Sequence, residues 1–116
     1  MKRAEAERRG RKGEGWAALW LRLHGWRIVG RRVKTPRGEI DLVARRGRHL
    51  AFIEVKWRAT GESLDTAIDA YRLRRVAAAA EAVAHRFARS DDTLRIDALL
   101  LAPGRWPRHI VNAWQP

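Results

Sequence analysis

The chain has 116 residues, with 25 basic against 13 acidic side chains and no cysteine. This length suits one domain, and a chain of this size buries about 60 to 70% of its unfolded surface, which is enough for a single core. The absence of Cys excludes a disulfide framework and a thiolate zinc site, and no apolar run approaches the ~20 residues that span a bilayer. We therefore expect a soluble, cytoplasmic protein without a membrane partner.

The net charge of +12 indicates a polyanionic partner, and of the two candidates, nucleic acid and an anionic membrane surface, we expect nucleic acid, with DNA first. Arg supplies 21 of the 25 basic residues, so a coding bias toward Arg is the alternative explanation for part of this charge.

The N-terminal segment, residues 1–12, contains six basic and two acidic residues and is predicted to be a flexible basic arm, with a single domain over residues 13–116. A first helix is expected from Gly13 to His24. Its predicted core stripe follows i, i+3, i+4, i+7 spacing and consists of Trp16, Leu19, Trp20 and Leu23. Glu14 lies in the first turn of this helix and points away from that stripe.

The remaining chain alternates strands with one long helix. A strand at 26–33 is followed by the turn Thr35-Pro36-Arg37-Gly38 and by two strands within 38–57. Ser63 or Asp65 is expected to cap a helix that runs to about Arg89, and strands follow at 93–102 and 109–114. The order αβββαβ, with a final short strand, predicts an α/β domain around a mixed sheet, because the helical crossover favours a parallel pair.

The stretch from Gly38 to Lys56 is predicted to be a hairpin whose two-residue turn begins at Gly47. In that register every pair across the turn sums to 95, so Asp41 is expected directly opposite Glu54, and Glu39 opposite Lys56. Side chains alternate faces along a strand, so these four are expected to form a charge cluster on one face. The other face is expected to be core, made of Ile40, Leu42, Ala44, Ala51, Ile53 and Val55.

Two carboxylates directly opposite each other on neighbouring strands repel, so Asp41 and Glu54 need a compensating charge. A divalent cation such as Mg²⁺ or Mn²⁺ supplies it most directly, and Mg²⁺ prefers sparse carboxylate sites that keep several waters. Lys56, two residues beyond Glu54, is then placed to orient or deprotonate a water, or to neutralise charge on a phosphate. The alternative is a structural ladder of ion pairs, Glu39–Lys56 and Glu54–Arg, without catalysis.

Asp41 followed by Glu54-Val55-Lys56 on the next strand resembles the D…(D/E)xK signature of the PD-(D/E)xK nuclease superfamily, whose restriction-endonuclease-like core has the same αβββαβ order. More narrowly, the chain resembles the bacterial YraN family of endonuclease-like proteins over about residues 13–114. The segments that carry this resemblance are Gly38-Glu39-Ile40-Asp41-Leu42, Phe52-Ile53-Glu54-Val55-Lys56 and Ile110-Val111-Asn112-Ala113-Trp114.

The resemblance implies that Asp41 and Glu54 are metal ligands and that Lys56 is the catalytic lysine. It also implies that Glu14 and the carbonyl of Val55 complete the metal site. The chain departs from the family at two positions, with Arg72 where Lys is common in the second helix and Trp57 where Thr or Ser often follows the EVK motif. The candidate nucleic-acid-binding residues are Arg58, Arg72, Arg37 and Lys34.

The leading hypothesis is a metal-dependent nuclease that hydrolyses DNA phosphodiesters, at branched, flapped or single-stranded structures. The alternatives are a non-catalytic nucleic-acid-binding module and a subunit of a repair, recombination or uptake assembly. The six tryptophans motivate the last, with Trp57, Trp106 and Trp114 as interface or base-stacking residues. Asp97 is expected to be an ion-pair or strand-end residue, and the four histidines show no metal-ligand spacing.

Overall fold

The computed structural model describes residues 2–58 and 70–114, and for residues 2–12 we describe the backbone alone. Helix α1 (Lys2–Leu23) precedes strands β1 (Arg27–Thr35), β2 (Gly38–Arg46) and β3 (His49–Trp57). Helix α2 (Ala70–Phe87) then leads to β4 (Thr93–Leu101) and the short β5 (Arg108–Ile110). The predicted αβββαβ core with a short final strand is confirmed, and in the part of the chain that we describe no helix is long and apolar enough to cross a membrane.

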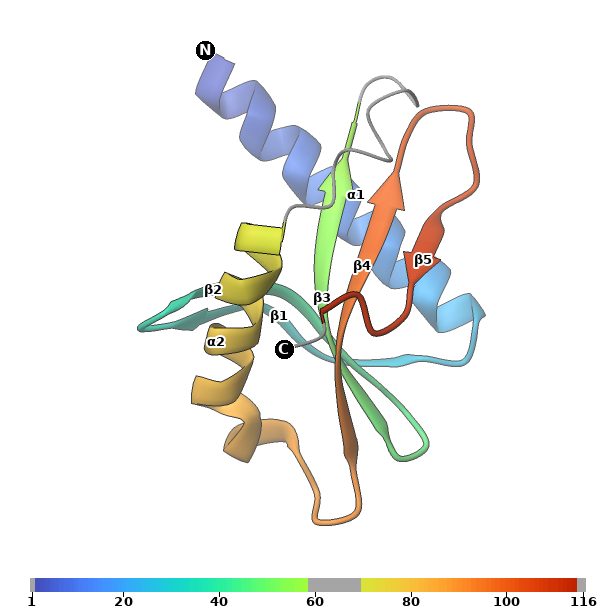
Figure 1. The fold of residues 1–116 in the computed structure, drawn as a ribbon. Coiled ribbons are helices and arrows are strands. Elements are labelled where there is room, and N and C mark those ends of the chain that lie inside the picture. Colours follow the sequence, from blue (N-terminus) through green and yellow to red (C-terminus); the bar gives the residue numbers. More distant parts are fainter. Residues whose placement is uncertain (1, 59–69, 115–116) are drawn as a thin grey trace.

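The five strands form one mixed sheet in the order β1-β2-β3-β4-β5, with α1 and α2 packed against it (Figure 1). Strands β3 and β4 are parallel, as the helical crossover predicts, and the other neighbours are antiparallel. Because β3 is paired on both sides and covered on both faces, most of its residues are buried. A charged side chain on β3 is therefore exceptional.

The β2–β3 hairpin has the predicted register, with Arg46 paired with His49 and Leu42 with Ile53. Its two-residue turn is formed by Gly47 and Arg48, and Gly47 has a φ of 61°, a conformation that glycine adopts without a steric penalty. The ladder ends at Leu42–Ile53, one pair short of Asp41 and Glu54. The two carboxylates are consequently not direct ladder partners, and that part of the prediction is wrong.

Both faces of the sheet carry a hydrophobic core, which corrects the expectation of one apolar and one charged face. The α1 side contains Leu42, Ala44, Ala51 and Ile53, whereas the α2 side contains Val33, Ile40, Val43, Leu50 and Phe52. Ile40 thus packs under α2 and not beside Leu42. The reason is that β2 before Leu42 is paired with β1 alone, and this twisted two-stranded extension leans beside α2 (Figure 1).

Helix α1 differs from its prediction in both its start and its buried face. It begins at Lys2 and so runs through the segment that we expected to be a flexible arm. Its buried residues are Ala17, Ala18 and Leu21, whereas Trp16, Leu19 and Leu23 are exposed and Trp20 is half-buried. Small side chains face the sheet because the helix lies close to it: a Cβ on Gly13 would stand 3.7 Å from the Cβ of Trp57.

Helix α2 buries Val76, Ala79, Ala80 and Val83 against the sheet, and Phe87 is partly buried. The proposed caps Ser63 and Asp65 lie outside the described residues. The C-terminal end of α2 is held by Asp92, whose carboxylate accepts hydrogen bonds from the Arg89 amide and from the Arg45 guanidinium. The last strand is shorter than predicted, because residues 111–114 form a turn and an irregular segment.

Candidate active site

The point where β2 and β3 separate is occupied by the side chain of Asp41. Its Oδ2 accepts a hydrogen bond from the backbone amide of Val55 at 2.8 Å, next to the end of the β2–β3 ladder. A side chain thus takes the place of a ladder bond and holds the two strands together where they begin to diverge. This arrangement fixes Asp41 beside the backbone of the Glu54-Val55-Lys56 motif.

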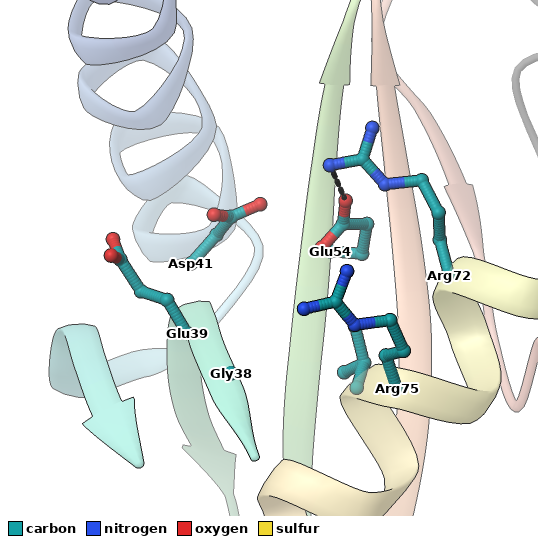
Figure 2. Close-up of a pocket in the computed structure, with 7 residues that line it drawn as sticks. Gly38, Glu39, Asp41, Glu54, Arg72 and Arg75 are labelled. Atoms are coloured by element: carbon teal, nitrogen blue, oxygen red, sulfur yellow. Dashed lines mark ion pairs between the residues drawn. The ribbon is translucent and has the colours of Figure 1, made fainter. Parts of the chain in front are cut away.

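A cavity of about 210 Å³ opens at this point, between β2, β3 and α2. It is lined by Gly38, Glu39, Asp41, Glu54, Arg72, Arg75 and Val76. Figure 2 shows Glu39 and Asp41 projecting from β2, Arg72 and Arg75 projecting from α2, and Glu54 on β3 between them. The cavity therefore combines carboxylates and guanidinium groups on opposite walls.

Asp41 has an unusual protonation equilibrium for an aspartate. Burial is the main reason that its pKa rises to about 7, and the negative charge of Glu54 raises it further. The Val55 amide and Lys56 act in the opposite direction, and Glu14 adds to the increase. Repulsion between Asp41 and Glu54, which the sequence predicted, is thus present in the folded protein even though the two residues are not ladder partners.

Glu54 and Lys56 form a buried ion pair on β3. Lys56 Nζ lies 3.2 Å from Glu54 Oε1, and both side chains are less than a tenth exposed. Burial lowers the pKa of Lys56, and the neighbouring Arg72 and Arg58 lower it further, whereas Glu54 raises it. The lysine is therefore less costly to deprotonate than a lysine in water.

Arg72 also pairs with Glu54, with Nη2 3.5 Å from Oε1 (Figure 2). Its side chain is 56% exposed, so the guanidinium reaches both the cavity and solvent. Arg75 was not among the predicted site residues, yet it lines the same cavity. Its position three residues after Arg72, which places the two on one helix face, is the sequence signal that identifies it.

Glu14 reaches the neighbourhood of the site from α1, because the buried face of this helix is the one that carries Ala18 and Leu21. Its Oε2 accepts a hydrogen bond from Arg32 Nε of β1 at 2.7 Å, and its charge contributes to the raised pKa of Asp41. The other predicted basic residues do not line the cavity. Lys34 and Arg37 are exposed near the tip of the β1–β2 hairpin, and Arg58 follows β3.

Comparison with known proteins places this chain in a family. The model of the uncharacterised protein family UPF0102 matches residues 13–101, which include Asp41, Glu54 and Lys56. The chain belongs to this family. UPF0102 is the YraN family that the sequence motifs resemble, an endonuclease-like family related to the PD-(D/E)xK proteins.

Relatives in UPF0102 align along the whole chain. A UPF0102 protein of Sphingopyxis alaskensis is 68% identical over 116 residues, and one of Erythrobacter litoralis is 67% identical over 116 residues, with both chains covered completely in each case. A UPF0102 protein of Parvibaculum lavamentivorans is 48% identical over 112 residues, which cover 96% of this chain and 84% of the relative. The family assignment thus applies to the complete domain.

Proposed function

We propose that this protein is a metal-dependent nuclease that hydrolyses phosphodiester bonds in DNA at branched, flapped or single-stranded structures. The observation that carries the proposal is the shared cavity of Asp41 and Glu54 at the end of the β2–β3 ladder. Keeping two carboxylates together in a partly buried place costs free energy, as the raised pKa of Asp41 records. Such perturbed groups in a cleft are typical of functional sites.

The available ligands fit a hard divalent cation, Mg²⁺ or Mn²⁺. Asp41 and Glu54 would hold it, with the Val55 carbonyl as a further ligand, and once bound it would polarise the phosphodiester and acidify a water. Among the described residues, no three or more His, Cys, Asp or Glu side chains lie together as a metal-binding group, so the proposed site has two carboxylates, and Glu14 pairs with Arg32 instead. A sparse pair of carboxylates is the usual protein contribution to magnesium sites, which keep several waters.

Lys56 and the arginines of α2 supply the remaining charges that the reaction needs. Lys56 Nζ, with its lowered pKa, can orient a water or accept a proton, and in its charged form it offsets negative charge on the phosphate. Arg72 and Arg75 face the same cavity and can bind phosphate oxygens through their guanidinium groups. Arg72 thereby takes the place of the lysine that is common in the family.

A second candidate function is supported by the contacts of Glu54. Lys56 and Arg72 lie 3.2 and 3.5 Å from its Oε1, and this neutralises the carboxylate without a metal ion. The same surface would then serve a non-catalytic nucleic-acid-binding module or a subunit of a repair, recombination or uptake assembly. For such a module, the logarithm of the binding constant for DNA or RNA would fall linearly with the logarithm of the salt concentration. No cleavage product would form when a divalent cation is added.

The test is cleavage of labelled single-stranded, duplex, flap and four-way-junction DNAs in Mg²⁺ or Mn²⁺, with EDTA as a control. Glu54→Ala should abolish cleavage and leave DNA binding intact or stronger, because it removes a negative charge that faces the phosphate. Glu81→Gln, on an exposed position of α2, is the matched control and should cleave like the wild type. Unchanged cleavage by Glu54→Ala contradicts the nuclease assignment, and salt-sensitive binding without any product favours the second candidate.

A further inference from the structure

A second and larger cavity, of about 620 Å³, lies where β3 and β4 end. Three tryptophans line it: Trp16 from α1, Trp57 at the end of β3, and Trp106 from the segment between β4 and β5. Arg105 and the backbone turn at 102–104 complete its walls. Sequence analysis singled out Trp57 and Trp106 separately, and the fold brings them together with Trp16, which had been assigned to the core.

Two of the three tryptophans of this cavity are exposed at a considerable cost. Trp106 is 85% exposed and Trp16 is 41% exposed, although burial of aromatic surface is among the most favourable contributions to folding. The segment that carries Trp106 is a defined turn, because Gly104 has a φ of 69° and the Arg105 amide donates to the Ala102 carbonyl at 3.3 Å. A clustered, exposed aromatic surface of this kind marks a binding site.

This aromatic cavity adjoins the candidate active site through β3. Lys56 and Trp57 are consecutive, so their side chains project from opposite faces of one strand end. Lys56 belongs to the carboxylate site under α2, whereas Trp57 packs with the core on the α1 side. The Arg58 amide donates to the Leu101 carbonyl at 2.9 Å, which holds the ends of β3 and β4 together.

The positive charge of this region indicates which class of ligand the cavity binds. Arg105 lines the cavity, Arg58 follows Trp57, and no acidic side chain is found among the lining residues in the described part of the chain. The whole chain has a net charge of +12. Aromatic faces beside positive charge are how proteins bind single-stranded nucleic acid, where bases stack on the rings and phosphates contact the cations. A duplex keeps its bases stacked on each other and offers no free face to the tryptophans.

We propose that the cavity between Trp16, Trp57 and Trp106 binds an unpaired nucleobase of a single strand that crosses the ends of β3 and β4. This proposal depends on the proposed nuclease function in one respect only, the position of the scissile phosphate. The same single strand would place that phosphate near Asp41 and Glu54. The preferred substrate is therefore single-stranded, or a flap with a single-stranded arm, and intact duplex binds more weakly.

The test is binding of a fluorescent 20-nucleotide oligothymidine in EDTA, measured by anisotropy, so that it is independent of cleavage. Trp106→Ala should weaken binding about tenfold, since one base stacked on an aromatic ring contributes about that factor or more. The affinity of Trp106→Ala for duplex DNA, or for an abasic oligonucleotide of the same length, should fall less than about twofold. These ligands offer phosphates but no free base to the ring. Leu23→Ala, at an exposed apolar position at the end of α1 that does not line the cavity, is the control and should bind oligothymidine like the wild type.

Salt dependence separates stacking from charge. Trp106→Ala should keep the slope of log K against log salt, whereas Arg105→Ala should make it shallower by about 0.7. Equal affinity of Trp106→Ala and the wild type for oligothymidine would overturn the proposal. The proposal would also be overturned if Trp106→Ala lost as much affinity for the abasic strand as for oligothymidine. If Trp106→Ala has a lower sedimentation coefficient than the wild type, the wild type self-associates through Trp106. The occupant of the cavity is then a second copy of the chain and not a nucleobase. Absence of cleavage with these binding results intact would remove the nuclease function and leave the base site.

Discussion

Asp97 and Asp41 are two aspartates in the same sheet with opposite surroundings. Asp97 on β4 is fully buried, and its carboxylate accepts hydrogen bonds from Arg95 at 2.8 Å and from the Asn112 amide at 2.9 Å, with His109 Nε2 at 2.7 Å. Burial alone would raise its pKa, but the bonds from His109, Arg95 and Asn112 outweigh burial and lower it. Asp41 is partly exposed to solvent and has a pKa raised to about 7, since burial and Glu54 outweigh the single Val55 amide bond.

The difference separates a carboxylate that stabilises the fold from the one that the proposed function requires. Asp97 joins β4, β5 and the segment after β5 through donors that match its charge, so its ionised form stabilises the native state. Asp41 faces another carboxylate, so its ionised form is unfavourable until a cation or a proton arrives. The expectation that Asp97 is an ion-pair residue is confirmed.

The largest expected effect is on catalysis at Asp41. Asp41→Asn should reduce divalent-dependent DNA cleavage by at least about 100-fold, because the amide is a poor ligand for Mg²⁺ and Mn²⁺. Asp97→Asn, assayed at a temperature where it is folded, should cleave within a few-fold of the wild type. The measurement is the initial rate on the best DNA of the panel, and similar losses in both variants would remove the distinction between the two aspartates.

The largest effect on stability belongs to Asp97. Asp97→Asn should lower the free energy of unfolding by about 3 kcal/mol, because it leaves Arg95 buried beside a neutral amide. Urea denaturation followed by tryptophan fluorescence measures this loss. A loss below about 1 kcal/mol would mean that the cluster contributes little to the native state.

Asp41→Asn should change stability in the opposite direction. The amide oxygen can still accept the Val55 hydrogen bond, while the repulsion with Glu54 disappears. In EDTA at pH 8, we expect a gain on the order of 1 kcal/mol in the free energy of unfolding. A loss of stability in the same urea experiment would show that the Asp41 charge is not strained in the folded protein.

The smallest predicted effect is a difference in pH dependence. Because the folded pKa of Asp41 is raised to about 7, the folded state binds a proton between about pH 4 and 7 that the unfolded chain does not. The stabilising effect of Asp41→Asn should therefore shrink as the pH falls from 7 toward 4. Asp97 has a lowered pKa, so its contribution is present above about pH 4 and is lost as the pH falls through its folded pKa. Paired urea titrations from about pH 2 to 8 measure both trends.

Local sequence rules predicted the hairpin well and the surroundings of the site only in part. Gly47 fixed the turn and thus the register, and charges on an otherwise apolar strand identified Glu54 and Lys56. The end of the ladder at Leu42 was not predictable, because it depends on the twist of β1 and β2 and on one hydrogen bond from the Val55 amide to the Asp41 carboxylate. The Asp97 cluster needs β4, β5 and the following turn side by side, which no local pattern encodes.

The buried face of α1 was predicted wrongly because large apolar residues outweigh small ones in a periodicity argument. The distance between helix and sheet decides the matter: Ala17 and Ala18 fit against the strands, whereas Trp16 remains at the surface. This error also concealed the aromatic cavity, since a tryptophan assigned to the core cannot be considered as a binding residue.

The most direct test of the central claim is Mn²⁺ binding measured by electron paramagnetic resonance, without DNA, for the wild type, Asp41→Asn and Asp97→Asn. We predict that the wild type and folded Asp97→Asn bind Mn²⁺ at a site that Mg²⁺ competes for, and that Asp41→Asn binds at least about tenfold more weakly. Equal binding by Asp41→Asn and the wild type would contradict the claim that the carboxylates of Asp41 and Glu54 form a divalent-cation site.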